Sequence, residues 1–334
     1  MKKSTITTAA LVVILAALAV CAWLMFGGSF SGGLTYANAD KYTAGDTKIS
    51  ASVENLDVDW TEGRVNIEYH SGTGVTVSET ADKALSEDDK LRWWLDGNTL
   101  RIRYAKSGFR LSGNLNKVLT VSLPEGAVLK TADIASTSGD LNIPALAADE
   151  IRLASTSGDI TAVTDTKKLT VSATSGDVHV RQDAEIDTVT VSSTSGSAAC
   201  ELAGAKNVSM DSSSGGLSLA VTGSVETVKL SSTSGNIYPN LASAGKAEIS
   251  STSGSVNGRV AAFTDLKIGS TSGSVTVKLP AEPGFTCKAG TTSGSFSSNL
   301  PLTKNGDKYV CGDGSAKCEI GTTSGDIRVE PVQD

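Results

Sequence analysis

The sequence repeats a short turn signal at a nearly fixed distance, and this restricts the possible fold more than any other feature. Thr-Ser-Gly occurs nine times, and a tenth copy reads Ser-Ser-Gly. Most copies are 18 to 21 residues apart, and the last spacing is 31 residues. Such a period is typical of proteins in which equivalent segments stack on each other. The ten glycines are Gly139, Gly158, Gly176, Gly196, Gly215, Gly235, Gly254, Gly273, Gly294 and Gly325.

Apolar residues flank each glycine at fixed positions. They lie seven and five residues before it and two residues after it, as Ile151, Leu153 and Ile160 do around Gly158. Apolar residues two apart indicate a strand with one buried face. Each repeat therefore reads as a strand, a Ser-Gly turn, a second strand and a second turn. We expect the glycine to permit the turn and a Ser or Thr hydroxyl to bond its backbone.

A repeat of this length excludes a strand-helix-strand unit, which needs roughly 30 residues. It fits one coil of a solenoid with parallel strands about 4.8 Å apart and equal positions stacked. We therefore predict an all-β, single-domain parallel β-solenoid, or β-helix, that is regular over residues 129–334. Residues 48–128 are expected to form degenerate N-terminal coils and a cap, because Leu56 and Val65 flank Gly63 with the repeat's spacing. Terminal repeats of a solenoid are usually atypical.

The N-terminus carries an uncharged run, TTAALVVILAALAVCAWLMF, over residues 7–26. About twenty such residues can span a bilayer as a helix. Lys2 and Lys3 precede the run, so residues 1–6 should be cytoplasmic and the rest extracytoplasmic. We predict an uncleaved transmembrane helix followed by a flexible linker over residues 27–47. The alternatives are cleavage after Ala37-Asn38-Ala39 and lipidation at Cys21.

Several stretches together resemble a bacterial envelope family described as putative adhesins with β-strand repeats, a domain of unknown function. They are NLDVDWTEGRVNIEY, LRWWLDGNTLRIRY, KVLTVSLPEG and the STSGD and TTSGDIRV repeats. The resemblance covers roughly residues 48–330. It implies an extracytoplasmic surface protein, often found in Gram-positive bacteria beside envelope-stress systems. It supplies no catalytic residues.

The polar residues of the repeat suggest two kinds of surface site, and neither is favoured. Aspartate follows the repeat glycine in four coils only, at positions 140, 159, 177 and 326. Calcium takes six to eight oxygen ligands, so a stacked ion row would need a carboxylate in most coils. We interpret these aspartates as turn residues and predict no metal site and no cofactor. The outward threonines resemble an ice-binding array, but their neighbouring rank is mixed, which favours a structural ladder.

Three cysteines near the C-terminus, Cys287, Cys311 and Cys318, are candidates for a disulfide. Cys287 and Cys318 share one position of the repeat, and Cys311 lies in the insertion between them. An extracytoplasmic location permits a bridge between two of the three. The alternative for each is a small buried apolar side chain.

Aromatic residues concentrate in the predicted cap, and Trp94 and Trp60 are the candidates for stacking on a ligand ring. The alternative is that they fill the core. Because Trp93 and Trp94 are adjacent on a strand, one must point outward, and we expect this to be Trp94.

The sequence favours a membrane-anchored extracytoplasmic β-solenoid that provides a binding, adhesion or scaffolding surface of the cell envelope. Its partners would be the membrane, cell-wall glycan or another envelope protein. The formal net charge of −7 gives no support for binding nucleic acid. The alternatives are an envelope-stress sensing accessory protein and a polysaccharide-active β-helix enzyme. We expect no enzyme, because the repeat faces carry no recurrent acidic pair.

Overall fold

The computed structural model describes residues 35–108 and 115–332. These residues form two compact units, 35–181 and 182–332, where the sequence predicted a single domain. The predicted cytoplasmic residues 1–6 and transmembrane segment 7–26 lie outside the described residues. Within the described ranges, no helix is long and apolar enough to cross a membrane.

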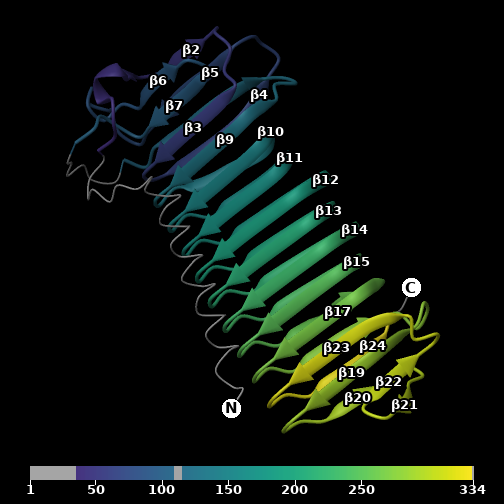
Figure 1. Cartoon of the computed structure of the whole chain (residues 1–334). Helices are drawn as coiled ribbons and strands as arrows, with labels where there is room; N and C mark the ends of the chain where they lie inside the picture. Colours follow the sequence, from purple (N-terminus) through teal and green to yellow (C-terminus); the bar gives the residue numbers. More distant parts are fainter. Residues whose placement is uncertain (1–34, 109–114, 333–334) are drawn as a thin grey trace. The chain divides into compact units, whose positions relative to one another are not determined.

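Strands make up nearly all the regular structure of the N-terminal unit (Figure 1). Its elements are η1 (Ala39–Lys41), β1 (Thr43–Ala44), β2 (Thr47–Ile49), β3 (Asn55–Trp60), β4 (Arg64–His70), β5 (Val75–Thr80), β6 (Arg92–Asp96), β7 (Thr99–Arg103), β8 (Val118–Pro124), β9 (Leu129–Ser136), β10 (Asp140–Ser155) and β11 (Ile160–Ala173). The division between the two units falls within β12 (Val178–Ser193).

The C-terminal unit is also built from strands. They are β13 (Ala198–Ser212), β14 (Leu217–Ser232), β15 (Ile237–Ser251), β16 (Val256–Val260), β17 (Phe263–Ser270), β18 (Val275–Leu279), β19 (Phe285–Thr291), β20 (Phe296–Ser298), β21 (Thr303–Asn305), β22 (Lys308–Cys311), β23 (Ala316–Thr322) and β24 (Ile327–Pro331). The all-β prediction is therefore confirmed for both units.

Equivalent positions of successive repeats lie beside each other in parallel strands, as the period predicted. In the C-terminal unit Leu230 of β14 pairs with Met210 of β13 and with Ile249 of β15. All three side chains are buried, and Leu230 is fully enclosed. The apolar positions of the repeat thus form a continuous internal ladder within this unit.

In β10 to β15 the second turn of the repeat is a bend within one continuous strand, whereas in the later coils it separates β16 from β17 and β18 from β19. A strand such as β10 runs from one Ser-Gly turn to the next, and its pairing with β11 shifts register between Ile143 and Leu146. Similar shifts occur between Leu202 and Ala205 in β13 and between Val221 and Ser224 in β14. A β-bulge bends a strand without ending its ladder, so no separate turn sequence is needed there.

The repeat glycines are required by stacking. Among the described residues, none of them has a positive φ. A Cβ on Gly254 would lie 2.0 Å from the carbonyl oxygen of Gly235, and one on Gly273 would lie 2.1 Å from that of Gly254. The backbones of neighbouring turns therefore approach more closely than any side chain allows. This differs from the expectation that glycine serves the turn's own conformation.

A buried hydroxyl three residues before the glycine closes each of several turns. Ser251 accepts a hydrogen bond from the N–H of Gly254 at 2.9 Å, and its hydroxyl donates to the carbonyl of Gly235 at 3.2 Å. Ser270, Thr291 and Thr322 make the same pair of contacts in their coils. This inward hydroxyl column bonds each turn both to itself and to its neighbour.

The side chain that follows the repeat glycine bonds the adjacent coil. The N–H of Asp159 donates to Oδ1 of Asp140 at 3.0 Å, and that of Asp177 donates to Oδ1 of Asp159 at 2.8 Å. Asn236 accepts in the same way from the N–H of Ser255 at 2.8 Å. These contacts agree with the interpretation of the aspartates as turn residues.

At the N-terminal end, the order of coils in space differs from their order in the sequence. β3 pairs with β7 and β9, and β4 pairs with β8 and β10, all in parallel. The coil β3–β4 therefore lies inside the stack, and the later coil β7–β8 lies outside it. Antiparallel strands cover this outer coil: β6 pairs with β7, and β5 pairs with β8. Such covering prevents the open edge from pairing with another chain.

The C-terminal end shows the same exchange. β23 pairs with both β17 and β19, and β24 pairs with both β18 and β20. The last coil of the chain thus lies between the two coils that precede it, β17–β18 and β19–β20 (Figure 1). The hairpin of β21 and β22 then covers β19 with antiparallel pairing. The last two repeat glycines are 31 residues apart because the hairpin of β21 and β22 lies between them.

Candidate ligand pocket

The candidate site lies on the outer face of β7, β6 and β3, in the N-terminal unit. Side chains alternate between the two faces of a strand, so Leu100 and Ile102 are buried while Arg101 and Arg103 point out. In the antiparallel pairing of β6 with β7, Trp94 lies opposite Arg101. Trp94 therefore takes the outward position that the sequence predicted for it.

One aspartate on the neighbouring strand holds both arginines. Asp57 lies opposite Arg101 in the β3–β7 pairing, and its Oδ2 accepts a bond from Nη1 of Arg101. Nη1 of Arg103 donates to Oδ1 of Asp57 at 2.7 Å, and Nη2 donates to Oδ2 at 3.1 Å. Burial alone would lower the pKa of Arg103, but the hydrogen bonds and charge of Asp57 outweigh burial and raise it. Asp57 thus fixes both arginines in place, and Arg103 stays charged.

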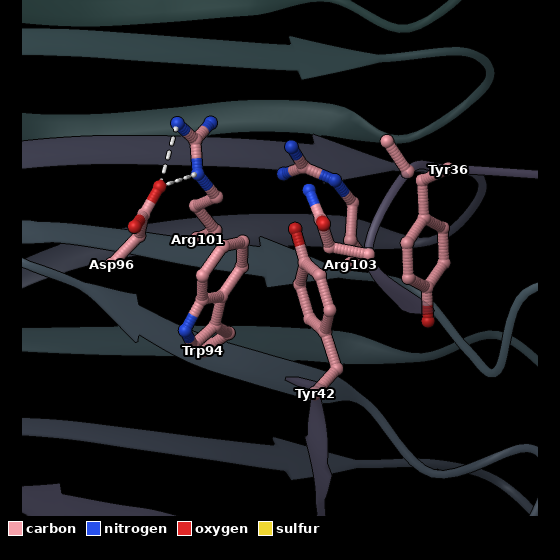
Figure 2. A pocket seen from close by; sticks show the side chains of 8 residues that line it. Tyr36, Tyr42, Trp94, Asp96, Arg101 and Arg103 are labelled. Atoms are coloured by element: carbon pink, nitrogen blue, oxygen red, sulfur yellow. Dashed lines mark hydrogen bonds and ion pairs between the residues drawn. The ribbon is translucent and has the colours of Figure 1, made fainter. Parts of the chain in front are cut away.

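Three aromatic rings form the walls of the pocket (Figure 2). The ring centroids of Tyr36 and Tyr42 are 4.8 Å apart, and Tyr42 meets Trp94 edge to face at 5.6 Å. Nζ of Lys41 lies 4.8 Å from the centre of the Trp94 ring, a cation–π distance. Burial raises the pKa of both tyrosines, so their hydroxyls stay protonated at neutral pH.

The segment before β1 brings the two tyrosines to this face. The hydroxyl of Tyr36 donates to the carbonyl of Ala105 at 2.9 Å, and the N–H of Ser107 donates to that hydroxyl at 3.1 Å. Asn38, the residue directly before η1, has a left-handed backbone with φ of 56°. The predicted flexible linker of residues 27–47 is therefore wrong from residue 35 onward, because Tyr36 and Tyr42 pack against the sheet.

The pocket enclosed by these residues has a volume of about 230 Å³. It is lined by Tyr36, Ala37, Asn38, Tyr42, Trp94, Asp96, Arg101 and Arg103. Pockets for drug-sized ligands measure roughly 300–1,000 Å³. This one therefore suits a single ring or a terminal group of a larger molecule. Its rings offer apolar faces, and its edges offer hydrogen-bond donors and acceptors.

Trp60, the second predicted stacking residue, does not line the pocket. It is fully buried beneath the sheet and packs edge to face on Tyr104, with ring centroids 4.9 Å apart. A ligand ring cannot reach it. The prediction for Trp60 is therefore corrected to a core role, the alternative that the sequence had left open.

Trp60 and Tyr104 instead surround the buried amine of Lys117. Nζ of Lys117 lies 5.0 Å from the Trp60 ring centre and 4.3 Å from that of Tyr104. It donates to the carbonyls of Asp89 and Tyr104 and pairs with Glu79 at 2.6 Å. The Lys117 side chain is fully buried, and that of Glu79 is 4% exposed. This cluster ties the long connections of the cap to its core.

The structure places the candidate disulfide residues on neighbouring strands as free thiols. Cys287 of β19 and Cys318 of β23 are directly in register, and both are buried. Their hydrogen bond raises the pKa of the Cys318 thiol, and burial adds to the shift. Cys311 is buried in β22, opposite Phe285. Register thus favours a bridge between Cys287 and Cys318, which stays a prediction.

Sequence reasoning missed most of the pocket. Tyr36, Asn38 and Tyr42 were assigned to a linker, and Arg101, Arg103 and Asp57 were not singled out. A signal was present, since two tyrosines within seven residues are unusual for a flexible linker. The ten turn glycines, in contrast, all lie in the turns where the repeat placed them.

Each unit is a stack of parallel β-coils whose terminal coil is covered by antiparallel strands, and the N-terminal unit carries the aromatic–arginine pocket. The sequence matches the Toastrack DUF4097 family over residues 53–167 and again over residues 160–330. The chain belongs to this family. Comparison with curated proteins gives no match.

Several solved structures are similar to the chain at low identity. A putative adhesin from Parabacteroides distasonis is 13% identical with a TM-score of 0.45, and the alignment covers 87% of this chain and 97% of that one. A putative lipid binding protein from the same species is 17% identical with a TM-score of 0.43, covering 88% and 97%. A putative cell adhesion protein from Clostridium sporogenes is 14% identical with a TM-score of 0.21, covering 87% and 100%.

Proposed function

We propose that this protein is a non-catalytic binding module of the bacterial cell envelope that recognises a glycan through the pocket of its N-terminal unit. The observation that carries the proposal is the grouping of Tyr36, Tyr42 and Trp94 around two fixed arginines. Aromatic faces pack against the apolar faces of sugar rings, while polar side chains at the rim bond the hydroxyls. The pairing of β3, β6 and β7 holds Trp94, Arg101 and Arg103 in place, which limits the entropy lost on binding.

The location of the module follows from the N-terminal sequence. The uncharged residues 7–26 behind Lys2 and Lys3 favour a single-pass anchor with the β units outside the cell. In this arrangement the pocket belongs to the unit that follows the membrane segment in sequence. A ligand within the envelope, such as cell-wall glycan, then suits the module.

Binding to isolated cell-wall glycan tests the proposal. The full-length protein should sediment with the glycan, and Trp94→Ala should reduce the bound fraction by about tenfold. Tyr238→Ala is the matched control, because Tyr238 is an exposed aromatic residue of the C-terminal unit, 45% exposed. Sedimentation with the glycan that is unchanged by Trp94→Ala would overturn the proposal.

The same samples separate the alternatives. Release of shortened glycan would favour a polysaccharide-active enzyme over a binding module. Capture of an envelope protein, without any glycan bound, would favour the stress-sensing accessory.

A further inference from the structure

We infer that the pocket selects an uncharged sugar ring and disfavours acidic sugars and phosphate-bearing polymers. The inference rests on the proposed function and narrows it to a ligand class. Arginines beside aromatic rings often suggest an anionic ligand, since a guanidinium pairs well with carboxylate or phosphate. In this pocket both arginines are already paired with carboxylates of the protein, which argues against an anionic ligand.

The donors of Arg101 are directed at two carboxylates of the protein. Its Nη1 donates to Asp57, while its Nε and Nη2 both lie 3.4 Å from Oδ2 of Asp96. Nη1 and Nη2 of Arg103 both donate hydrogen bonds to Asp57, and Nη1 also donates to the carbonyl of Ile102 at 2.9 Å. An anionic ligand would have to displace one of these carboxylates or bind beside it. Placing like charges together in a partly desolvated site is unfavourable.

Acidic side chains accompany the cations around the pocket. Asp57 and Asp96 pair with Arg101 and Arg103, and Arg92, whose charge acts on Tyr36, lies 3.9 Å from Asp88. Lys41 lies over the Trp94 ring, while Asp59 of β3 and Asp133 of β9 lie opposite Arg103 and Asp57 in the strand pairings. The site therefore has no excess positive field with which to attract an anion.

The remaining polar atoms suit hydroxyl groups, which both donate and accept. Asp96 uses Oδ2 for Arg101, so its Oδ1 can accept a bond from a ligand hydroxyl. The protonated hydroxyl of Tyr42 can donate or accept, and the amide of Asn38, which also lines the pocket, offers both roles. A volume of about 230 Å³ limits the occupant to about one ring.

Matched neutral and acidic oligosaccharides test the inference. The full-length protein is purified in a detergent without a sugar headgroup, because a maltoside or glucoside could occupy the pocket. Calorimetry then compares β-1,4-linked mannotetraose with β-1,4-linked tetramannuronate, and α-1,4-linked galactotetraose with α-1,4-linked tetragalacturonate; with matched linkages, the members of each pair differ only at C6. We expect a neutral member to bind at least about tenfold more tightly than its acidic partner. Trp94→Ala should abolish this binding, and Trp94→Phe should retain part of it.

The outcomes separate the inference from the proposed function. Tighter binding of an acidic member that depends on Trp94 would overturn the inference and leave the glycan-binding function intact. Asp96→Asn sharpens this comparison, since removing a negative charge should improve the binding of the acidic members. Binding of no member would overturn the inference, while sedimentation with cell-wall glycan still decides the proposed function; binding unaffected by Trp94→Ala would overturn both. Tyr238→Ala should change none of these values, and circular dichroism should show that every variant is folded.

Discussion

The hydroxyl of Ser270 donates a hydrogen bond to the carbonyl oxygen of Gly254, one coil away, at 2.9 Å. The same hydroxyl accepts from the N–H of Gly273 at 2.9 Å, so a single buried atom joins two turns. Removing it leaves a donor and an acceptor without their partner, which costs about 1–3 kcal/mol. Ser270→Ala should therefore lower the free energy of unfolding by about this amount, as measured by denaturant titration.

Ser270→Thr is the matched control for that change. Thr291 and Thr322 occupy the same position in other coils and make the same two contacts. The threonine variant should thus lose less stability than the alanine variant. Equal losses would show that the hydroxyl bonds contribute nothing.

Substitution of a repeat glycine by alanine should be strongly destabilising. A Cβ on Gly254 would meet the carbonyl oxygen of Gly235 at 2.0 Å, so Gly254→Ala must push neighbouring coils apart. Overpacking of this kind costs about 1–3 kcal/mol or more. Gly290 has nothing within 4 Å of an added Cβ, so Gly290→Ala serves as the control. Thermal unfolding should separate the two variants clearly.

The internal ladder predicts a local response to cavity formation. Leu230 is fully buried between Met210 and Ile249, so Leu230→Ala should cost about 2–5 kcal/mol. Thr233→Ser keeps its hydroxyl at a partly exposed position and should cost much less. Hydrogen exchange on the Leu230→Ala variant should rise over residues 208–256, because solenoid stability is mainly a sum of neighbour terms. A loss of protection centred elsewhere would contradict the register.

Breaking the buried ion pair between Lys117 and Glu79 should strongly destabilise the cap. Lys117→Met removes the cation and leaves the Glu79 carboxylate buried without a counter-ion, which costs about 3–5 kcal/mol. Adding Glu79→Gln to that variant should restore part of the lost stability, since no charge then remains. A double-mutant cycle by chemical denaturation measures this coupling. Additive losses would mean that the two side chains do not interact.

The thiol of Cys200 should be unreactive in the native protein. Burial raises the pKa of the Cys200 thiol to about 12, so at pH 8 it stays protonated and should resist iodoacetamide in the native protein. Its reactivity should grow only as the pH rises toward that pKa or as the protein unfolds. Rapid native labelling of Cys200 at pH 8, seen by peptide mass spectrometry, would contradict its buried position.

A bridge between Cys287 and Cys318 should form in protein isolated from an oxidising compartment. Neighbouring parallel strands lie about 4.8 Å apart, within the range that a disulfide can span. Non-reducing peptide mapping should find this linkage in both the wild-type protein and the Cys311→Ser variant. A bridge that includes Cys311 would contradict the pairing expected from register.

The repeat alone was sufficient to predict the strand faces, the buried ladders and the parallel register, because period and alternation express direct steric requirements. Leu56 and Val65 even revealed a coil that lacks the Ser-Gly signal. The exchanged coil order at each end was not predictable in this way. Every coil carries nearly the same inward pattern, so the pattern specifies which positions stack but not which coils become neighbours.

The pocket was predictable only in part, for a related reason. Strand alternation placed Trp94 outward, but it could not show that Tyr36 and Tyr42 return to the same face from a segment with no strand pattern. Trp60 illustrates the opposite error, since its inward position on β3 follows from Leu56 and Val58, four and two residues earlier.

The exchanged coils at the C-terminus bear on how the chain is completed as it is synthesised. Among the described residues, β19 and β20 pair only with β22, β23 and β24, all later in the sequence. The coil at residues 285–298 therefore gains its strand partners only after residues 308–331 have followed. Residues 308–331 are the last to be added, and their strands hold the coil at residues 285–298 in place. A ribosome or translocon that releases the chain early would leave this coil without a partner.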